Sequence, residues 1–155
     1  MAAMKKERIV FSLWLLLSLF WVVFIFTHSL KPAEASSRQS LGVLAFLQNY
    51  FPDISHHLVR KLGHFVEFTL LGFCSTQTLC RGLKIFRENN PPSPGFCFLL
   101  ALMGGLAVAA CDEWIQTGIP GRSGKIMDVL LDMSGVMCGI LISLCIMLLR
   151  KKKAP

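Results

Sequence analysis

Residues 9–27 read IVFSLWLLLSLFWVVFIFT, a run of nineteen positions with no charged side chain. At about 1.5 Å per residue, a helix of this length nearly matches the roughly 30 Å of hydrocarbon in a bilayer. A cleavable signal peptide is the competing interpretation, because a basic cluster precedes the run and Ala33-Glu34-Ala35 imitates a cleavage site. The apolar core of such signals is usually shorter than this run, and we therefore predict a membrane-spanning helix.

The composition of the whole chain also indicates a membrane protein. Of its 155 residues, 54% are hydrophobic and 16% are charged, whereas about a quarter of the residues in an average soluble domain are charged. The formal net charge of +7 does not indicate nucleic-acid binding, because the basic residues lie at the ends of apolar runs. The six cysteines include no Cys-x-x-Cys pair and indicate neither a zinc site nor a disulfide framework. We expect the chain to lie in membrane lipid and not to bind nucleic acid.

Three further apolar segments follow, at residues 62–79, 96–111 and 129–149. The segment at 62–79 is the least apolar of them, because it carries a histidine, a glutamate and a glutamine. We predict an all-α polytopic membrane helix bundle of four transmembrane helices, with residues 1–155 forming a single domain.

The distribution of charge predicts which ends of the helices face the cytoplasm. With both termini inside, ten of the sixteen basic residues and two of the nine acidic residues lie on the cytoplasmic side. The other six basic and seven acidic residues lie outside or in the outer ends of the spans. This asymmetry follows the positive-inside rule. We therefore predict a multi-pass plasma-membrane protein with cytoplasmic N- and C-termini and external loops at 28–61 and 117–127.

The connecting segments differ in character. Residues 40–51 (SLGVLAFLQNYF) are apolar but too few to span a membrane, so an interfacial helix and a plain loop are both open interpretations. Residues 88–95 (ENNPPSPG) predict a cytoplasmic turn. The external segment 117–125 (TGIPGRSGK) is not a P-loop. It can still direct backbone N–H groups and the cations of Arg122 and Lys125 at an anion, with a solvated turn as the alternative.

Polar residues gather near the outer ends of the predicted spans. On a helix that advances about 100° per residue, Arg60, His64 and Glu67 share one face, and a salt bridge that orients the helix end is the alternative interpretation. Asp132 stands among apolar neighbours, where a carboxylate costs a few kcal/mol unless it faces the protein interior and has a partner. The catalytic or ligand-binding candidates are His64, Glu67, Asp112, Glu113, Gln116, Arg122, Asp128 and Asp132, and the anion-binding candidates are Arg60, Arg122 and Lys125.

The last predicted span also carries a packing signal. Gly135 and Gly139 form a Gly-x-x-x-Gly pair and share a face with Asp128 and Asp132. Small residues at this spacing let two helix backbones approach closely in lipid. We therefore predict that this face packs against another helix.

Two motifs give the chain a resemblance to a known family. Residues 61–68 (KLGHFVEF) resemble the first motif of the VanZ-like membrane proteins. Residues 112–116 (DEWIQ) together with residues 120–124 (PGRSG) resemble the second motif. The part of the chain that carries the resemblance covers about residues 60–140.

The resemblance implies a cell-envelope function in a bacterial plasma membrane. The namesake of the family lowers susceptibility to the glycopeptide antibiotic teicoplanin by a mechanism that is not established, so no reaction is implied. Arg60 stands where the family often has Asp, and Phe68 stands where it often has Tyr. For this reason we carry no family role over to those two positions.

Two hypotheses for function follow from these residues. In the first, the protein is not a catalyst, and its outer face binds a lipid headgroup, a glycopeptide or a partner protein. In the second, it is a membrane-embedded hydrolase or transferase acting on a phosphorylated or acylated envelope lipid. The basic candidates would then hold the anion, and His64 with Glu67, or the Asp112/Glu113 pair, would transfer protons. A divalent metal bound by His64 and the carboxylates is a variant of this second hypothesis.

Overall fold

The computed structural model describes residues 2–87 and 93–152 of the chain. This part of the chain is helical and contains no strand, which confirms the prediction of an all-α fold. The five helices are α1 (Ala2–Ser29), α2 (Ala33–Gln48), α3 (His56–Phe86), α4 (Pro94–Thr117) and α5 (Ile126–Lys152).

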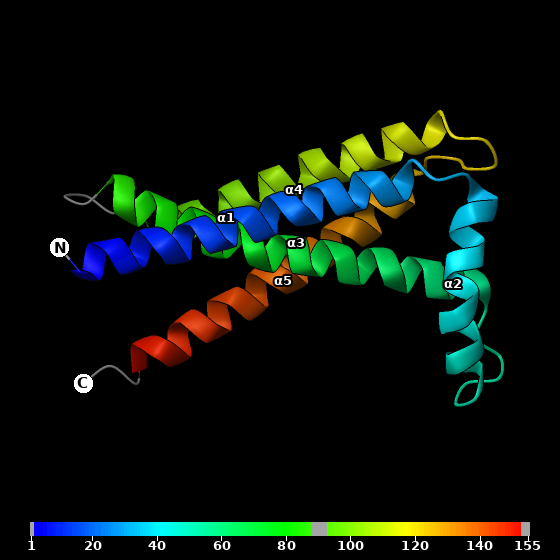
Figure 1. Ribbon diagram of the computed structural model, residues 1–155, viewed down its shortest axis with the longest axis horizontal. Helices are drawn as coiled ribbons and strands as arrows, with labels where there is room; N and C mark the ends of the chain where they lie inside the picture. Colours follow the sequence, from blue (N-terminus) through cyan, green and yellow to red (C-terminus); the bar gives the residue numbers. More distant parts are fainter. Residues whose placement is uncertain (1, 88–92, 153–155) are drawn as a thin grey trace.

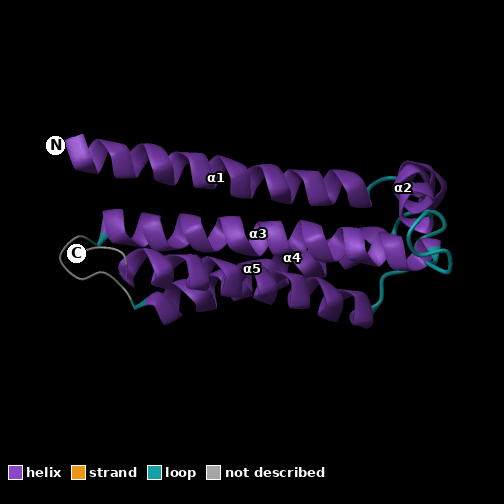
Figure 2. Cartoon of the chain, turned by 90° about the horizontal axis from the view of Figure 1, so that it is seen from below, coloured by secondary structure: helices purple, strands orange, loops and turns teal. Residues whose placement is uncertain are grey.

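Four long helices run side by side, and the short α2 crosses one end of them (Figures 1 and 2). We call this end of the bundle the α2 end. The start of α1 and the end of α5 both lie at the opposite end (Figure 1). The loop between α4 and α5 lies at the α2 end, close to the end of α1. Residues far apart in the sequence therefore meet at the α2 end.

Local sequence determines where several helices begin and end. The Oγ of Ser55 accepts a hydrogen bond from the backbone N–H of Leu58 at 3.2 Å and so caps the start of α3. Helix α4 begins at Pro94, whose fixed φ and missing N–H suit a first helical turn. The loop after α4 turns at Gly121, which has a φ of 76° that glycine adopts without strain.

Three helices are long and apolar enough to cross a membrane: Met4–Ser29, Pro94–Thr117 and Ile126–Leu149. Of the four predicted spans, the segment at 62–79 is the one that is not among these three. That segment lies inside α3, which has 31 residues and is long enough to cross. Its polar side chains lower its mean hydropathy below that of the other three helices.

The interior position of α3 explains how it accommodates polar residues. It contacts all four other helices within the described chain, and α5 most extensively. Gln77 of α3 donates a hydrogen bond to Ser143 Oγ of α5 at 2.9 Å. Thr78 Oγ1 of α3 lies 3.0 Å from Ser18 Oγ of α1. These two side chains of α3 thus find partners on neighbouring helices, as polar residues in membrane bundles commonly do.

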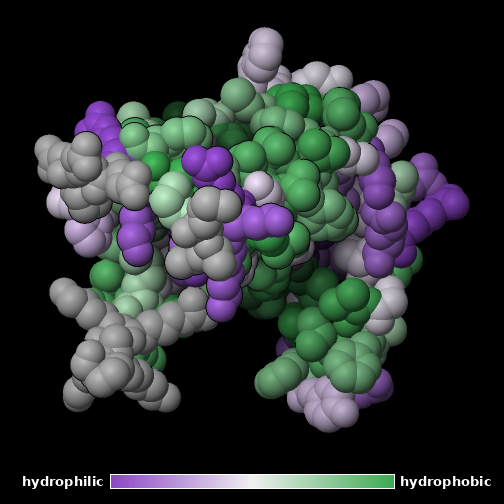
Figure 3. All heavy atoms as spheres, turned by 60° about the vertical axis from the view of Figure 1, so that its left-hand side comes forward, coloured by the Kyte–Doolittle hydropathy of each residue, from purple (hydrophilic) through white to green (hydrophobic). Residues whose placement is uncertain are grey.

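The surface of the bundle is apolar over its middle. Figure 3 shows hydrophobic side chains over a large part of the face in view, with hydrophilic side chains along its right side and from its left side to its centre. Exposed leucines and phenylalanines on α1, α4 and α5 contribute to this surface. Such an arrangement suits contact with lipid chains.

Helices α3 and α5 approach closely at the two glycines of the predicted packing face. A Cβ added to Gly135 would lie 2.6 Å from the backbone oxygen of Phe65. A Cβ added to Gly139 would collide with the backbone of Thr69. Asp132 is one helical turn from Gly135, so this close packing carries its side chain toward α3. The glycines therefore help to position the polar residues at the α2 end.

Most of the segment at residues 40–51, for which a helix and a plain loop were both open, belongs to helix α2. The segment is helical, but the helix begins seven residues earlier, at Ala33, and ends at Gln48. Pro32 precedes the helix, and Ser40 lies within it and not at its start. Within the turn predicted at 88–95, residues 88–92 lie outside the described part of the chain. Helix α4 begins at Pro94, earlier than the span predicted from residue 96.

Candidate functional site

Seven polar side chains from α1, α3, α4 and α5 lie close together at the α2 end. We call them the polar cluster: His28, His64, Glu67, Asp112, Glu113, Gln116 and Asp132. The three carboxylates of α4 and α5 and the amide of Gln116 are buried, while the two histidines are partly exposed. Burying this many ionisable groups costs free energy unless they are paired or bind a ligand.

His28 joins the end of α1 to the middle of the cluster. Its Nδ1 lies 3.0 Å from Glu67 Oε1 on α3, which is hydrogen-bonding distance for a donor and a carboxylate. The His28 ring also stacks beside the ring of His64, with 6.1 Å between the centroids and 18° between the planes. The side chains of His28 and Glu67 are 26% and 11% exposed, so their contact is partly shielded from solvent.

Hydrogen bonds from Gln116 and from the following loop hold the two carboxylates of α4. Gln116 Nε2 donates to Asp112 Oδ2 at 2.9 Å and to Glu113 Oε1 at 3.2 Å. The other oxygen of Glu113 accepts the backbone N–H of Lys125 at 2.8 Å. Gly124 allows this contact, because an added Cβ would lie 2.5 Å from the backbone oxygen of Glu113.

His64, Asp112 and Asp132 lie next to one another within the cluster. His64 Nδ1 lies 3.9 Å from Asp112 Oδ2, which is too far for a hydrogen bond. One ligand atom from each of the three residues lies within 4.8 Å of the other two. Asp112 and Asp132 are 0% and 1% exposed. These residues are the ones that could hold a metal ion.

Positive charge borders the cluster. Lys61 Nζ lies 2.7 Å from Asp128 Oδ1, so α3 and α5 are joined by an ion pair at this level. Arg122 Nη2 donates a hydrogen bond to the backbone oxygen of His28 at 3.4 Å. Burial lowers the pKa of the Arg122 guanidinium from its ordinary value, and the nearby charge of Arg60 lowers it further. A guanidinium group can form a bidentate hydrogen-bonded pair with a phosphate or a carboxylate.

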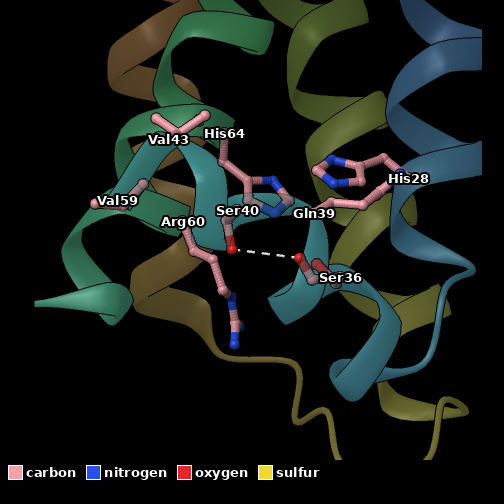
Figure 4. A pocket seen from close by; sticks show the side chains of 9 residues that line it. His28, Ser36, Gln39, Ser40, Val43, Val59, Arg60 and His64 are labelled. Carbon is pink, nitrogen blue, oxygen red and sulfur yellow. Dashed lines mark hydrogen bonds between the residues drawn. The ribbon is translucent and has the colours of Figure 1, made fainter. Parts of the chain in front are cut away.

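Two cavities reach the cluster. The larger, of about 200 Å³, lies between α2 and the ends of α1 and α3. In Figure 4 the rings of His28 and His64 face each other across it, the serines of α2 lie below them, and Arg60 points away. The smaller, of about 30 Å³, has room for one water-sized group and is lined by Lys61, His64 and Asp132 among others. Because His64 lines both cavities, it lies between the larger pocket and the buried carboxylates.

The structure brings most of the residues selected from the sequence to one place. Six of them belong to the polar cluster: His64, Glu67, Asp112, Glu113, Gln116 and Asp132. Arg60, Arg122 and Asp128 lie at its border. Lys125 contributes its backbone N–H, whereas its side chain has no ion-pair partner among the described residues. A salt bridge within the Arg60, His64 and Glu67 face is likewise absent from the described residues, because Glu67 pairs with His28 instead.

Sequence reasoning missed His28. The predicted first span ended at Thr27, and His28 was treated as the first residue of an external loop. In the structure α1 continues to Ser29 and carries the histidine into the bundle. A polar residue directly after an apolar run, one turn or less beyond the predicted boundary, is the signal that would have found it.

The comparisons with known proteins give a family and no close relative. The family model described as VanZ/LLP1 matches residues 14–149. No curated protein and no solved structure is similar enough to the chain to count as a match. The matched range includes both cavities and every residue of the polar cluster. It covers most of the sequence and confirms the resemblance found in the two motifs, so the chain belongs to the VanZ/LLP1 family.

Proposed function

We propose that the protein reduces susceptibility to teicoplanin by binding the headgroup of an envelope lipid at the polar cluster. Membership of the VanZ/LLP1 family supports a membrane protein of the cell envelope. We place it in a bacterial plasma membrane, with both termini in the cytoplasm and the α2 end at the outer face. The excess of basic residues near the opposite end supports this orientation.

We also propose that α3 crosses the membrane together with the three apolar helices. It runs beside them over their length (Figure 2). Its polar side chains contact other helices, which would shield them from lipid. A helix that is satisfied by protein on several sides does not need the hydropathy of an isolated span.

The observation that carries the proposal is the buried polar cluster with a pocket beside it. The carboxylates can accept hydrogen bonds from hydroxyl or ammonium groups, and Arg60 and Arg122 can hold a phosphate. These are the groups that phosphorylated lipid headgroups contain. The larger pocket has a volume of about 200 Å³. This is below the roughly 300–1,000 Å³ of sites for drug-sized ligands, so the pocket suits a headgroup and not a whole glycopeptide.

The test is expression of the full chain in a teicoplanin-susceptible bacterium. We expect the wild type to raise the inhibitory concentration of teicoplanin, and Arg122→Ala to lose most of that effect at unchanged membrane abundance. Arg38→Ala is the matched control, because Arg38 is 76% exposed on α2 and pairs only with Glu34 in the described chain. Protection that survives in Arg122→Ala, or a wild type without effect, would contradict the proposal.

A second candidate function is a hydrolase or transferase acting on a phosphorylated or acylated envelope lipid. The His28–Glu67 pair favours it, because an imidazole oriented by a carboxylate is a common general base. His28 lines the pocket proposed for the headgroup, and Glu67 lies directly behind it as its hydrogen-bonding partner. Purified protein should then convert such a lipid, and His28→Ala should abolish the conversion while helicity is retained. Absence of turnover with every phosphorylated envelope lipid supplied would leave the binding function alone.

A further inference from the structure

We infer that His64, Asp112 and Asp132 bind one divalent transition-metal ion, Mn²⁺ or Zn²⁺, inside the bundle. The inference rests on the proposed function for its purpose, because the ion would supply a second contact for the phosphate of a headgroup. Metal binding itself can be tested without that function. The three residues come from α3, α4 and α5, so the ion would join three helices that are separate in sequence.

The distances between the three side chains suit a metal site. Ligand atoms around an ion with bonds of about 2.1 Å lie about 3.0–3.5 Å apart. The ligand atoms of the three residues lie within 4.8 Å of one another, and His64 Nδ1 is 3.9 Å from Asp112 Oδ2. Side-chain rotations that move these atoms by about 1–2 Å would therefore bring all three to the spacing of metal ligands.

Each of the three residues has an atom ready to coordinate. His64 Nδ1, Asp112 Oδ1 and Asp132 Oδ2 are buried and have no hydrogen-bond partner among the described residues. Buried Ser29 lies beside Asp112, but its Oγ is not in hydrogen-bonding geometry with any described group either. Buried oxygen and nitrogen atoms are rarely left without a partner in folded proteins. A cation at this point would satisfy all three atoms.

The negative charge of the unpaired carboxylates also favours a bound cation. Glu67 has His28 as its partner, and Glu113 has Gln116 and the Lys125 N–H. Asp132 has no ion-pair partner in the part of the chain that the structure describes, and Asp112 has only the distant imidazole of His64. Two ionised carboxylates carry the charge that a divalent ion neutralises.

The donor set selects the class of ion. Carboxylates suit Mg²⁺, Ca²⁺ and Mn²⁺, whereas imidazole suits Zn²⁺ and other transition metals. One imidazole with two carboxylates is therefore best matched by Mn²⁺ or Zn²⁺. The hydrogen bond from Gln116 to Asp112 Oδ2 would fix one ligand from outside, as neighbouring groups commonly do in metal sites. The cavity of about 30 Å³ beside His64 and Asp132 would leave a coordination position for water or a phosphate oxygen.

The experiment is a metal titration of the purified full-length chain in detergent after treatment with a chelator. Free Mn²⁺ is measured by its paramagnetic resonance signal, and Zn²⁺ is added as a competitor. We expect one Mn²⁺ per chain, displaced by Zn²⁺. Asp132→Asn should weaken Mn²⁺ binding by about 100-fold or more, since loss of an outer contact alone costs about 10–100-fold. Asp53→Asn is the control, because this exposed acid lies in the loop before α3.

Two further measurements keep the outcome clear. If Asp132→Asn does not retain wild-type helicity, His64→Ala gives the decision, because the His64 side chain is 18% exposed whereas Asp132 is buried. A wild type that binds no stoichiometric metal, or variants that bind like the wild type, would overturn the inference. Teicoplanin protection without metal binding would overturn only this inference, and metal binding without protection would overturn only the proposed function.

Discussion

His28 Nδ1 and Glu67 Oε1 lie 3.0 Å apart, although 39 positions separate the two residues in the sequence. The contact ties the end of α1 to the buried polar cluster on α3. It also places the His28 ring beside the His64 ring at the wall of the larger pocket. The first apolar helix is therefore part of the site and not only a membrane anchor.

Replacement of His28 should destabilise the protein through Glu67. His28→Ala leaves a mostly buried carboxylate without its hydrogen bond, which costs about 1–3 kcal/mol. We expect a lower melting temperature in detergent. The double variant His28→Ala/Glu67→Gln should recover part of the loss, because the amide carries no charge. Equal melting temperatures for wild type and His28→Ala would show that the pair contributes nothing to stability.

A methyl group at Gly139 should disrupt the packing of α3 on α5. The added Cβ of Gly139→Ala would collide with the backbone of Thr69, and overpacking of this kind costs about 1–3 kcal/mol. The matched control is Gly104→Ala on α4, where an added Cβ meets no atom within 4 Å. The yield of monodisperse protein should fall for the first variant only. Similar yields for both would contradict the close helix contact.

Gly124→Ala should separate the loop from α4. The new Cβ would lie 2.5 Å from the backbone oxygen of Glu113, so the loop must shift and Lys125 loses its hydrogen bond to Glu113. We expect a large loss of teicoplanin protection and only a small decrease in the melting temperature. Gly118→Ala is the control, because its Cβ would make an ordinary contact of 3.6 Å with Ile115. Full protection in Gly124→Ala would show that the loop position is unimportant.

The orientation in the membrane can be tested by cysteine labelling. Ser123→Cys lies in an exposed position of the loop at the α2 end, and Lys84→Cys lies near the opposite end of α3. In intact cells a membrane-impermeant maleimide should label the first variant above the background of the parent chain and leave the second unlabelled. Lysis should expose Lys84→Cys to the reagent. The reverse pattern would place the α2 end in the cytoplasm.

Much of the fold and the site could be predicted because lipid makes polar residues conspicuous. Asp132 stands out in an apolar run, and its cost in hydrocarbon implied an interior position. The structure does bury it, but its Oδ2 has no hydrogen-bond partner among the described residues. Asp112 and Gln116 are four residues apart, and in the structure the amide does donate to that carboxylate. Charge and hydropathy sufficed to predict an all-α bundle with its polar residues at one end.

The remaining features depend on contacts between distant segments. His28 acquires its role only when α1 and α3 pack together, and no local pattern pairs it with Glu67. Helix α2 begins at Ala33, directly after Pro32, whereas the apolar pattern alone indicated a start near Ser40. The polarity of α3 is explained by neighbours such as Ser18 and Ser143, which hydropathy along the chain does not register.

The central place of α3 has a consequence for how the protein is made. A segment with so many polar groups gains little by leaving the insertion machinery for lipid on its own. Its most extensive partner is α5, which is synthesised last. Until α5 emerges, the side of α3 around Phe65 and Thr69 has no helix to cover it. Biogenesis of this protein should therefore be completed only near the end of translation, and chains that stop before α5 are expected to be substrates for membrane quality control.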